Sequence, residues 1–247
     1  MSDHWEFFPC QIDEHQASIF YNHGIREELK QSKIEQFLEI QVPLKFPDSA
    51  GIIQDTENDT LFVIEDRISD FIEQYNGLYV GRITMNGARH FLCYLDKPER
   101  EISVVMDYFR DKLGYDFHFR VAADPTKRQY WERLYPGKFE WQIIHNIKGL
   151  QKLKADGDDL VSERSIVHHF DFPEESNALD FEKWVLNFPA FTIVQKPYLE
   201  NKIYKMEVSY EGAPKLAELN QITTSFMANV EEFLGDYTGW GCEVRKA

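Results

Sequence analysis

The sequence predicts an α+β fold made of two ferredoxin-like units, each with the element order βαββαβ, an antiparallel sheet and helices on one face of that sheet. Three observations support this prediction. Strand-like and helix-like apolar spacings follow one another in the same order in both halves of the chain. The pair Asn86-Gly87 separates two apolar runs, and this pair is a strong short-range signal for a β-hairpin. The chain has 247 residues, which suits two domains of ordinary size.

The first half contains the elements of one unit in order. Polar and apolar residues alternate from Glu39 to Phe46, which predicts a strand with one solvent-facing side, and Pro43 favours an edge position. Acidic residues between Asp55 and Asp59 suit a helix N-terminus, and Gly114 suits a helix C-cap. The predicted elements are the strand 39–46, the helix 61–75, the strands 78–85 and 89–95, the helix 102–113 and the strand 115–121. Two strands near residues 5–11 and 17–21 precede them and are expected to extend the sheet.

The pattern is interrupted between the halves by Pro125, Pro136 and Gly137, so the predicted domains are residues 1–136 and 137–247. A short aromatic helix and a longer helix to about Lys154 occupy this region. The second half then repeats the element order of the first. Its predicted elements are the strand 164–172, the helix 178–188, the strand 190–195, a turn at 198–202, the strand 204–210, the helix 216–233 and a last strand that carries Gly239-Trp240-Gly241.

The charge of the chain favours protein partners over nucleic acids. The formal net charge is −15, and both halves are acidic: residues 1–136 carry 15 Lys and Arg against 24 Asp and Glu, and residues 137–247 carry 12 against 18. A negative field repels phosphate backbones and attracts basic protein segments, although solubility alone also explains such a charge. An RNA-reading sheet needs a basic and aromatic run on a central strand, and Lys205-Met206-Glu207-Val208 lacks it. Direct nucleic-acid binding is therefore not expected.

The cysteines and the apolar runs indicate a cytoplasmic protein. Cys10, Cys93 and Cys242 are odd in number and have no C-x-x-C spacing, which is typical of free thiols in a reducing compartment. The first residues show no signal-peptide pattern. No apolar run reaches the roughly 18 residues of a membrane helix, so no membrane contact is expected.

A search for reactive groups predicts neither a catalytic site nor a metal or organic cofactor. Asp55, Glu57 and Asp59 have the spacing of a calcium loop, but Thr60 stands where that loop needs glycine. His168 and His169 are neighbours on a predicted strand, so they point to opposite faces and cannot bind one metal ion. Nucleophile elbows, P-loops and zinc-protease motifs are absent from the sequence.

Tyr237-Thr238-Gly239-Trp240-Gly241 is the segment of the chain least typical of an ordinary strand. Two interpretations remain open for Trp240. It is either a core or bulge residue, with glycines that let the strand bend around it, or an aromatic anchor for a partner.

Two resemblances follow from these motifs. Tyr237 with Gly239-Trp240-Gly241, and the pair His168-His169 after the acidic turn 155–159, resemble the bacterial regulator of ribonuclease E activity B over about residues 137–247. The first half, with Trp5-Glu6-Phe7-Phe8, the run Gly77–Gly81 and the Asn86-Gly87 hairpin, resembles an uncharacterised bacterial domain family that often precedes this regulator.

The resemblance implies a non-catalytic regulator that binds protein, specifically the arginine-rich, non-catalytic scaffold of a ribonuclease E-type enzyme. The candidate partner-binding residues are Tyr237, Gly239, Trp240, Gly241, His168 and His169. Two departures separate the chain from the family pattern: it ends without the long acidic tail, and it carries an additional N-terminal unit. Two alternatives remain, an enzyme or small-molecule sensor that uses a cleft between the two units, and a homodimer that pairs open sheet faces.

Overall fold

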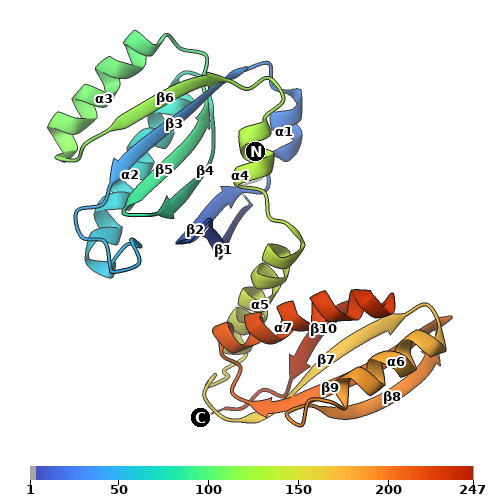
Figure 1. Cartoon of the computed structure of the whole chain (residues 1–247). Helices are drawn as coiled ribbons and strands as arrows, with labels where there is room; N and C mark the ends of the chain where they lie inside the picture. Colours follow the sequence, from blue (N-terminus) through green and yellow to red (C-terminus); the bar gives the residue numbers. More distant parts are fainter. Residues whose placement is uncertain (1–3, 247) are drawn as a thin grey trace. The chain divides into compact units, whose positions relative to one another are not determined.

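The structure, a computed structural model, describes residues 4–246. The chain divides into two compact units, Met1–Glu140 and Trp141–Ala247. Each unit contains one antiparallel sheet, and the order of the strands in both sheets confirms the predicted α+β class. Figure 1 shows the elements of both units. No helix among residues 4–246 is long and apolar enough to cross a membrane.

The first unit has a six-stranded sheet with the order β1-β2-β4-β5-β3-β6. The last four strands of this order, β4-β5-β3-β6, have the arrangement that a βαββαβ plait requires, and the hairpin of β1 and β2 extends the sheet beyond β4 as predicted. The elements are β1 (Trp5–Ile12), β2 (His15–Asn22), α1 (Arg26–Gln31), β3 (Gln36–Pro43), α2 (Asp55–Gln74), β4 (Leu78–Met85), β5 (Ala88–Tyr94), α3 (Glu99–Leu113), β6 (His118–Ala123) and α4 (Arg128–Arg133).

Local sequence explains the turns of this unit. Asn86 and Gly87 join β4 to β5 with φ values of 47° and 73°, the left-handed conformations of a tight hairpin turn. Gly114 ends α3 with φ 67°, as a C-cap glycine does. Helices α2 and α3 bury their apolar stripes on one face of the sheet, in a core that includes Leu61 and Ile102.

Two predictions for β3 are wrong. The strand lies between β5 and β6 and is therefore not an edge strand. Pro43 is tolerated because it is the last residue of β3, and β6 pairs with β3 only as far as Gln41. The strand also ends earlier than expected, because the backbone N–H groups of Lys45 and Phe46 donate to the carboxylate of Glu57 on α2.

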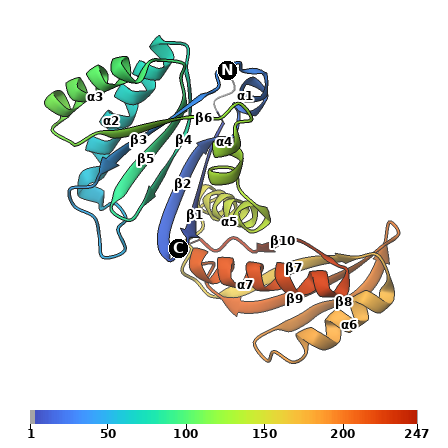
Figure 2. The ribbon, with the colours of Figure 1, turned by 45° about the horizontal axis from the view of Figure 1, so that its top comes forward.

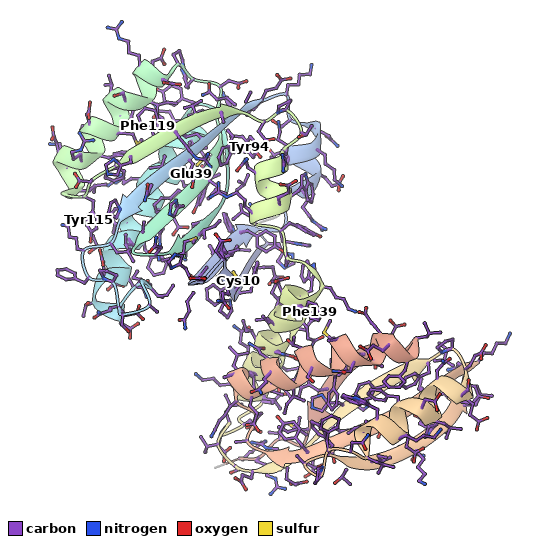
Figure 3. All side chains as sticks on the ribbon, in the orientation of Figure 1. Cys10, Glu39, Tyr94, Tyr115, Phe119 and Phe139 are labelled. Carbon is purple, nitrogen blue, oxygen red and sulfur yellow. The ribbon has the colours of Figure 1, made fainter. Side chains whose placement is uncertain are left out.

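The predicted solvent-facing side of β3 is also wrong at Glu39, which is only 5% exposed. This carboxylate lies on the sheet face opposite the helices, in the middle of the first unit (Figure 3). His90, Arg120 and Arg133 donate hydrogen bonds to it at 2.7–2.9 Å. Burial alone would raise the pKa of Glu39, but these bonds and the charge of Arg133 hold it well below its usual range.

The second unit has a four-stranded sheet with the order β10-β7-β9-β8, again the order of a βαββαβ plait. Helices α6 and α7 lie on one face of this sheet (Figure 2). Strand β8 is longer than predicted and runs to Glu200, so the turn is confined to Asn201 and Lys202. The elements are α5 (Lys138–Ala155), β7 (Arg164–Phe172), α6 (Glu175–Val185), β8 (Thr192–Glu200), β9 (Ile203–Gly212), α7 (Leu216–Val230), the short 3-10 turn Glu231–Phe233 and β10 (Asp236–Cys242).

Candidate functional site

The Gly-Trp-Gly segment forms a β-bulge in the edge strand β10. Tyr237 pairs with Phe170 and Gly239 pairs with His169, so Thr238 is an extra residue in the ladder. Tyr237 and Trp240 are three positions apart and would point to opposite faces of a regular strand. The bulge brings both onto the face that packs against the helices. Gly239 has φ 138°, a conformation that favours glycine, which explains its place in the bulge.

Trp240 is half-buried where the edge of the sheet meets α5. Its Nε1 donates to Oδ1 of Asn146 at 2.8 Å. The ring lies directly over Gly149, where an added Cβ would come within 2.9 Å of the ring atom Cζ2. Together with Leu150 of α5, it packs against the buried cluster that contains Ile166 of β7. These contacts give Trp240 a structural role, the attachment of α5 to the sheet.

His168 and Tyr237 form a buried pair on the same helix-facing side. His168 is fully buried, and its Nδ1 lies 2.9 Å from the Tyr237 hydroxyl. Burial lowers the pKa of His168 to about 3, with a smaller contribution from His169, so this imidazole is neutral at ordinary pH. Tyr237 packs against Phe170 and Phe226. Both residues therefore belong to the core of the second unit.

His169 lies on the opposite, open face of the sheet, as the alternation of strand side chains predicts. Its side chain is 43% exposed and its Nδ1 lies 3.4 Å from a carboxylate oxygen of Glu207. Gly239 and Gly241 lie on this face as well, opposite His169 and Val167. The six candidate residues are thus divided between two faces. His168, Tyr237 and Trp240 face the helices, and His169, Gly239 and Gly241 face outward.

The open face is acidic. Strand register places Asp236 of β10 next to Asp171 of β7, and Lys205 of β9 beyond it. Glu207 lies in the next row beside His169, and Glu211 lies two rows further along β9. Asp236 and Asp171 are like charges directly opposite each other, an arrangement that is unfavourable unless a cation lies nearby. This face carries five carboxylates and one lysine, listed as Asp171, Asp236, Glu200, Glu207, Glu211 and Lys205, and Lys205 is paired with Glu200 at 2.7 Å.

A groove of about 450 Å³ lies between α5 and β10, on the other side of the edge strand. Trp240 and Gly241 line it from β10, His145 and Lys152 line it from α5, and Asp156 lines it from the turn after α5. Its charges are mixed in sign. The groove therefore favours no particular charge in a bound segment.

The acidic turn before β7 fixes the end of β10. The carboxylate of Asp158 accepts hydrogen bonds from the guanidinium of Arg164 and from the backbone N–H of Arg245. Arg164 also donates to the backbone carbonyl of Glu243 at 2.8 Å. Hydrogen bonds from Arg164 lower the pKa of Asp158 to about 2, so the clamp stays charged. The acidic turn 155–159, which is part of the resemblance, therefore holds the end of β10 in place.

The calcium-loop spacing near the start of α2 does not form a metal site. Glu57 is only 2% exposed, and its oxygens accept hydrogen bonds from two backbone N–H groups and from the hydroxyl of Tyr115 at 2.8 Å. Within residues 4–246, no group of three or more His, Cys, Asp or Glu side chains is placed to hold a metal ion.

Sequence reasoning missed Asn146, which connects three elements of the site. It is fully buried, accepts hydrogen bonds from Gln142 and Trp240, and donates to Asn220 and Thr223 of α7. The signal was present in the sequence, because Asn146 occupies a position inside the apolar stripe of its helix. A polar residue in such a stripe needs a partner, and Trp240 supplies one.

Comparison with known proteins agrees with both resemblances. The profile of a family of unknown function, DUF695, matches residues 3–135, more than half of the chain. The chain belongs to this family. Residues 143–242 match the profile of the family "Regulator of ribonuclease activity B". The two matches follow the predicted order along the chain, so the sequence-based family assignment is confirmed.

Two other comparisons give no further information about the function of this DUF695 protein. None of the curated proteins matches the chain. An unknown protein from Galdieria sulphuraria, known from a crystal structure, is similar at 12% identity over 85% of this chain and 99% of its own. The TM-score is 0.22, which is too low to support an inference about fold or function.

Proposed function

We propose that this DUF695 protein is a non-catalytic regulator of ribonuclease activity whose second unit binds a basic protein segment on the open face of its sheet. The observation that carries the proposal is the match of residues 143–242 to the ribonuclease-regulator family, on a sheet whose open face is acidic. The expected partner is an arginine-rich scaffold segment of a ribonuclease E-type enzyme. Arginine forks pair well with carboxylates, and opposite charges accelerate encounter.

The three outward-facing candidate residues form the contact surface in this proposal. Gly239 and Gly241 have no side chains, so they leave the backbone of β10 accessible beside His169. Asp236 and Asp171 next to them supply the charge. The helix-facing residues His168, Tyr237 and Trp240 act indirectly, by holding β10 in its bulged register.

The test is the association rate of the full chain with an arginine-rich scaffold fragment, measured by surface plasmon resonance at low and physiological salt. Asp236→Lys removes one of the two paired aspartates, and we expect it to slow association by about tenfold at low salt. Glu232→Lys is the matched control, because Glu232 is an exposed acid in the turn that follows α7, outside the open face. This control should bind nearly as well as the parent.

Salt distinguishes this mechanism from nonspecific adhesion. Raising the salt concentration should slow association of the parent more than that of Asp236→Lys, because the variant has lost part of the attraction that salt screens. The proposal fails if the folded parent does not bind the fragment at low salt. It also fails if Glu232→Lys weakens association as much as Asp236→Lys does.

A further inference from the structure

The hairpin of β1 and β2 leaves a groove on the helix-facing side of the first sheet. Strand register continues the rows of the sheet outward from the core: Arg82 of β4 pairs with Phe20 of β2, which pairs with Phe7 of β1. Helix α2 covers the inner strands and presents Phe62 and Asn58 to this groove. The groove has a volume of about 670 Å³. That volume is within the range of sites for small organic ligands.

Two arginines of the central strands line the inner wall of the groove. Arg82 donates to both oxygens of Glu65 through a single nitrogen, Nη1, at 2.5 and 2.6 Å. No hydrogen-bond partner is present for Nε or Nη2 of Arg82 among residues 4–246. These two nitrogens form the edge of a guanidinium that binds a carboxylate or phosphate through two parallel bonds.

Arg89 supplies a second positive charge near the Nε and Nη2 edge of Arg82. The residue is 2% exposed and donates from Nε to the Thr84 hydroxyl at 3.2 Å. Its Nη1 is buried and makes no hydrogen bond within the described part of the chain, since the nearest oxygen of Glu65 is 3.9 Å away. Burial and the charge of Arg82 lower the pKa of Arg89 to about 10, which reflects an incompletely compensated cation.

The carboxylates near the two arginines already accept hydrogen bonds from other groups. Glu65 is shared by Arg82 and the hydroxyl of Tyr79, which donates to it at 2.7 Å. Glu57 contributes weakly to the electrostatics of Arg89, but its oxygens accept from two backbone N–H groups and Tyr115. Within the described residues, Glu65 supplies the one carboxylate within 4 Å of these arginines, so a bound anion would add a second counter-charge at this wall.

Aromatic rings flank the cationic edge. The guanidinium carbon of Arg82 lies 4.4 Å from the ring centre of Phe20 and 5.6 Å from that of Phe62. Phe7 and Phe62 are each 46% exposed and line the same groove, so they form an apolar patch of the kind that marks a ligand or partner site. Gln16, Ser18 and Asn58 add polar side chains at the groove. Exposed rings with a few polar groups suit a planar organic body.

We propose that this groove binds a small organic anion, a carboxylate or phosphate monoester attached to a planar ring, with the free Nε and Nη2 edge of Arg82 on the oxyanion and the ring beside the exposed Phe7 and Phe62. Residues 1–136 carry 24 acidic against 15 basic side chains, so a polyanion such as nucleic acid is repelled at longer range. A ligand with one or two charges fits the local site and avoids that repulsion.

The experiment is a titration of the full chain with phenyl phosphate and with benzoate, followed by the ¹H–¹⁵N signals of arginine Nε and of the backbone. Inorganic phosphate tests the oxyanion without the ring, and benzamide tests the ring without the charge. We expect the Arg82 Nε signal to shift with phenyl phosphate, with benzoate, or with both. The tighter of the two probes identifies the oxyanion. Benzamide and inorganic phosphate should each bind at least about tenfold more weakly.

Variants connect the signal to the groove. Asn58→Glu places a negative charge in the groove, and Thr60→Glu places the same charge on an exposed position of α2 two residues away. We expect Asn58→Glu to lose the shift and Thr60→Glu to retain it. Arg82→Lys keeps the charge and removes the two-nitrogen edge, which should weaken binding by about tenfold.

Three results would overturn the proposal. One is the absence of any shift with both ring-bearing anions. Another is equal binding of benzamide and benzoate, which would leave the arginines without a role. The third is equal binding by the parent and Asn58→Glu. If Arg82→Lys does not fold, the comparison of Asn58→Glu with Thr60→Glu still decides the question, because neither substitution alters the pair of Arg82 and Glu65.

Discussion

Replacing Trp240 by alanine is expected to destabilise the second unit by about 3 kcal/mol. The indole is half-buried, so the packing loss is expected to fall below the range for fully buried aromatic residues, at about 2 kcal/mol. The lost bond to Asn146 adds about 1 kcal/mol. Asn146 itself stays satisfied, because its Oδ1 also accepts from Gln142 at 2.8 Å. Trp240→Phe retains most of the packing and should cost about 1 kcal/mol.

A double-mutant cycle with Gly149 makes this prediction specific to the ring. Gly149 lies in α5, where alanine is ordinarily favoured over glycine by about 1 kcal/mol. In the parent, however, the new Cβ would come within 2.9 Å of the Trp240 ring. Gly149→Ala should therefore destabilise the parent by about 1 kcal/mol and stabilise Trp240→Ala by a similar amount.

The measurement is urea unfolding followed by far-ultraviolet circular dichroism, together with hydrogen exchange of peptides from residues 141–246. The hydrogen-exchange data separate the second unit from the first. The expected signature in Trp240→Ala is faster exchange in α5 than in β7. A Gly149→Ala substitution that stabilises both backgrounds equally would refute the reasoning, because the ring would then not lie over α5.

Three further predictions concern single groups. Unfolded histidine has a pKa near 6.5, and burial lowers the pKa of folded His168 to about 3. The contribution of His168 to the unfolding free energy should therefore be unchanged well above pH 6.5 and should fall on acidification by up to about 1.4 kcal/mol per pH unit. The substitution His168→Phe should remove this part of the slope in urea titrations. Glu39→Gln should cost the first unit about 2 kcal/mol in urea unfolding, because the charge-assisted hydrogen bonds from Arg120 and Arg133 weaken while both arginines stay partly solvated. An unchanged midpoint would contradict this. Gly87→Ala should lower the unfolding free energy by about 1 kcal/mol through backbone strain alone, since φ is 73° and no atom lies within 4 Å of the new Cβ. The thermal unfolding midpoint measures this loss, and a higher midpoint in the variant would contradict the prediction.

Much of the fold follows from local patterns in the sequence. Period-two alternation predicts β7 with the bounds that the structure has, residues 164–172. The Asn86-Gly87 pair and Gly114 predict one turn and one helix end, because each needs a left-handed conformation. These features depend on neighbours within a few residues, and a single sequence contains that information.

Features that depend on distant residues were not predictable in this way. Glu39 lies on the polar side of an alternating strand, yet it is buried because distant residues hydrogen-bond its carboxylate: His90, Arg120 and Arg133, which lie 51, 81 and 94 residues away. The central position of β3 depends on β5 and β6 and has no local signal. Alternation cannot reveal such partners, since it reports only that a residue faces away from the apolar side.

The candidate site was likewise predictable only where local strand geometry decides the direction of a side chain. The opposite directions of His168 and His169 follow from strand geometry and are confirmed. The shared direction of Tyr237 and Trp240 depends on the extra residue Thr238, which a pairing register reveals and a sequence does not. Two glycines around a tryptophan indicate an irregular strand, but they do not specify which face the ring takes.

The net charge of −15 predicts the sign of a partner only for a surface that carries that charge. Salt screens exposed charges beyond about 8 Å at physiological ionic strength, so a bound group responds mainly to its immediate neighbours. On the open face of the second sheet those neighbours are Asp171, Asp236 and Glu207, which favour a cation. In the groove of the first unit they are Arg82 and Arg89, which favour an anion although the surrounding unit is acidic. If both proposals hold, the same chain has surfaces for ligands of opposite sign, and the long-range negative field disfavours large polyanions at the groove.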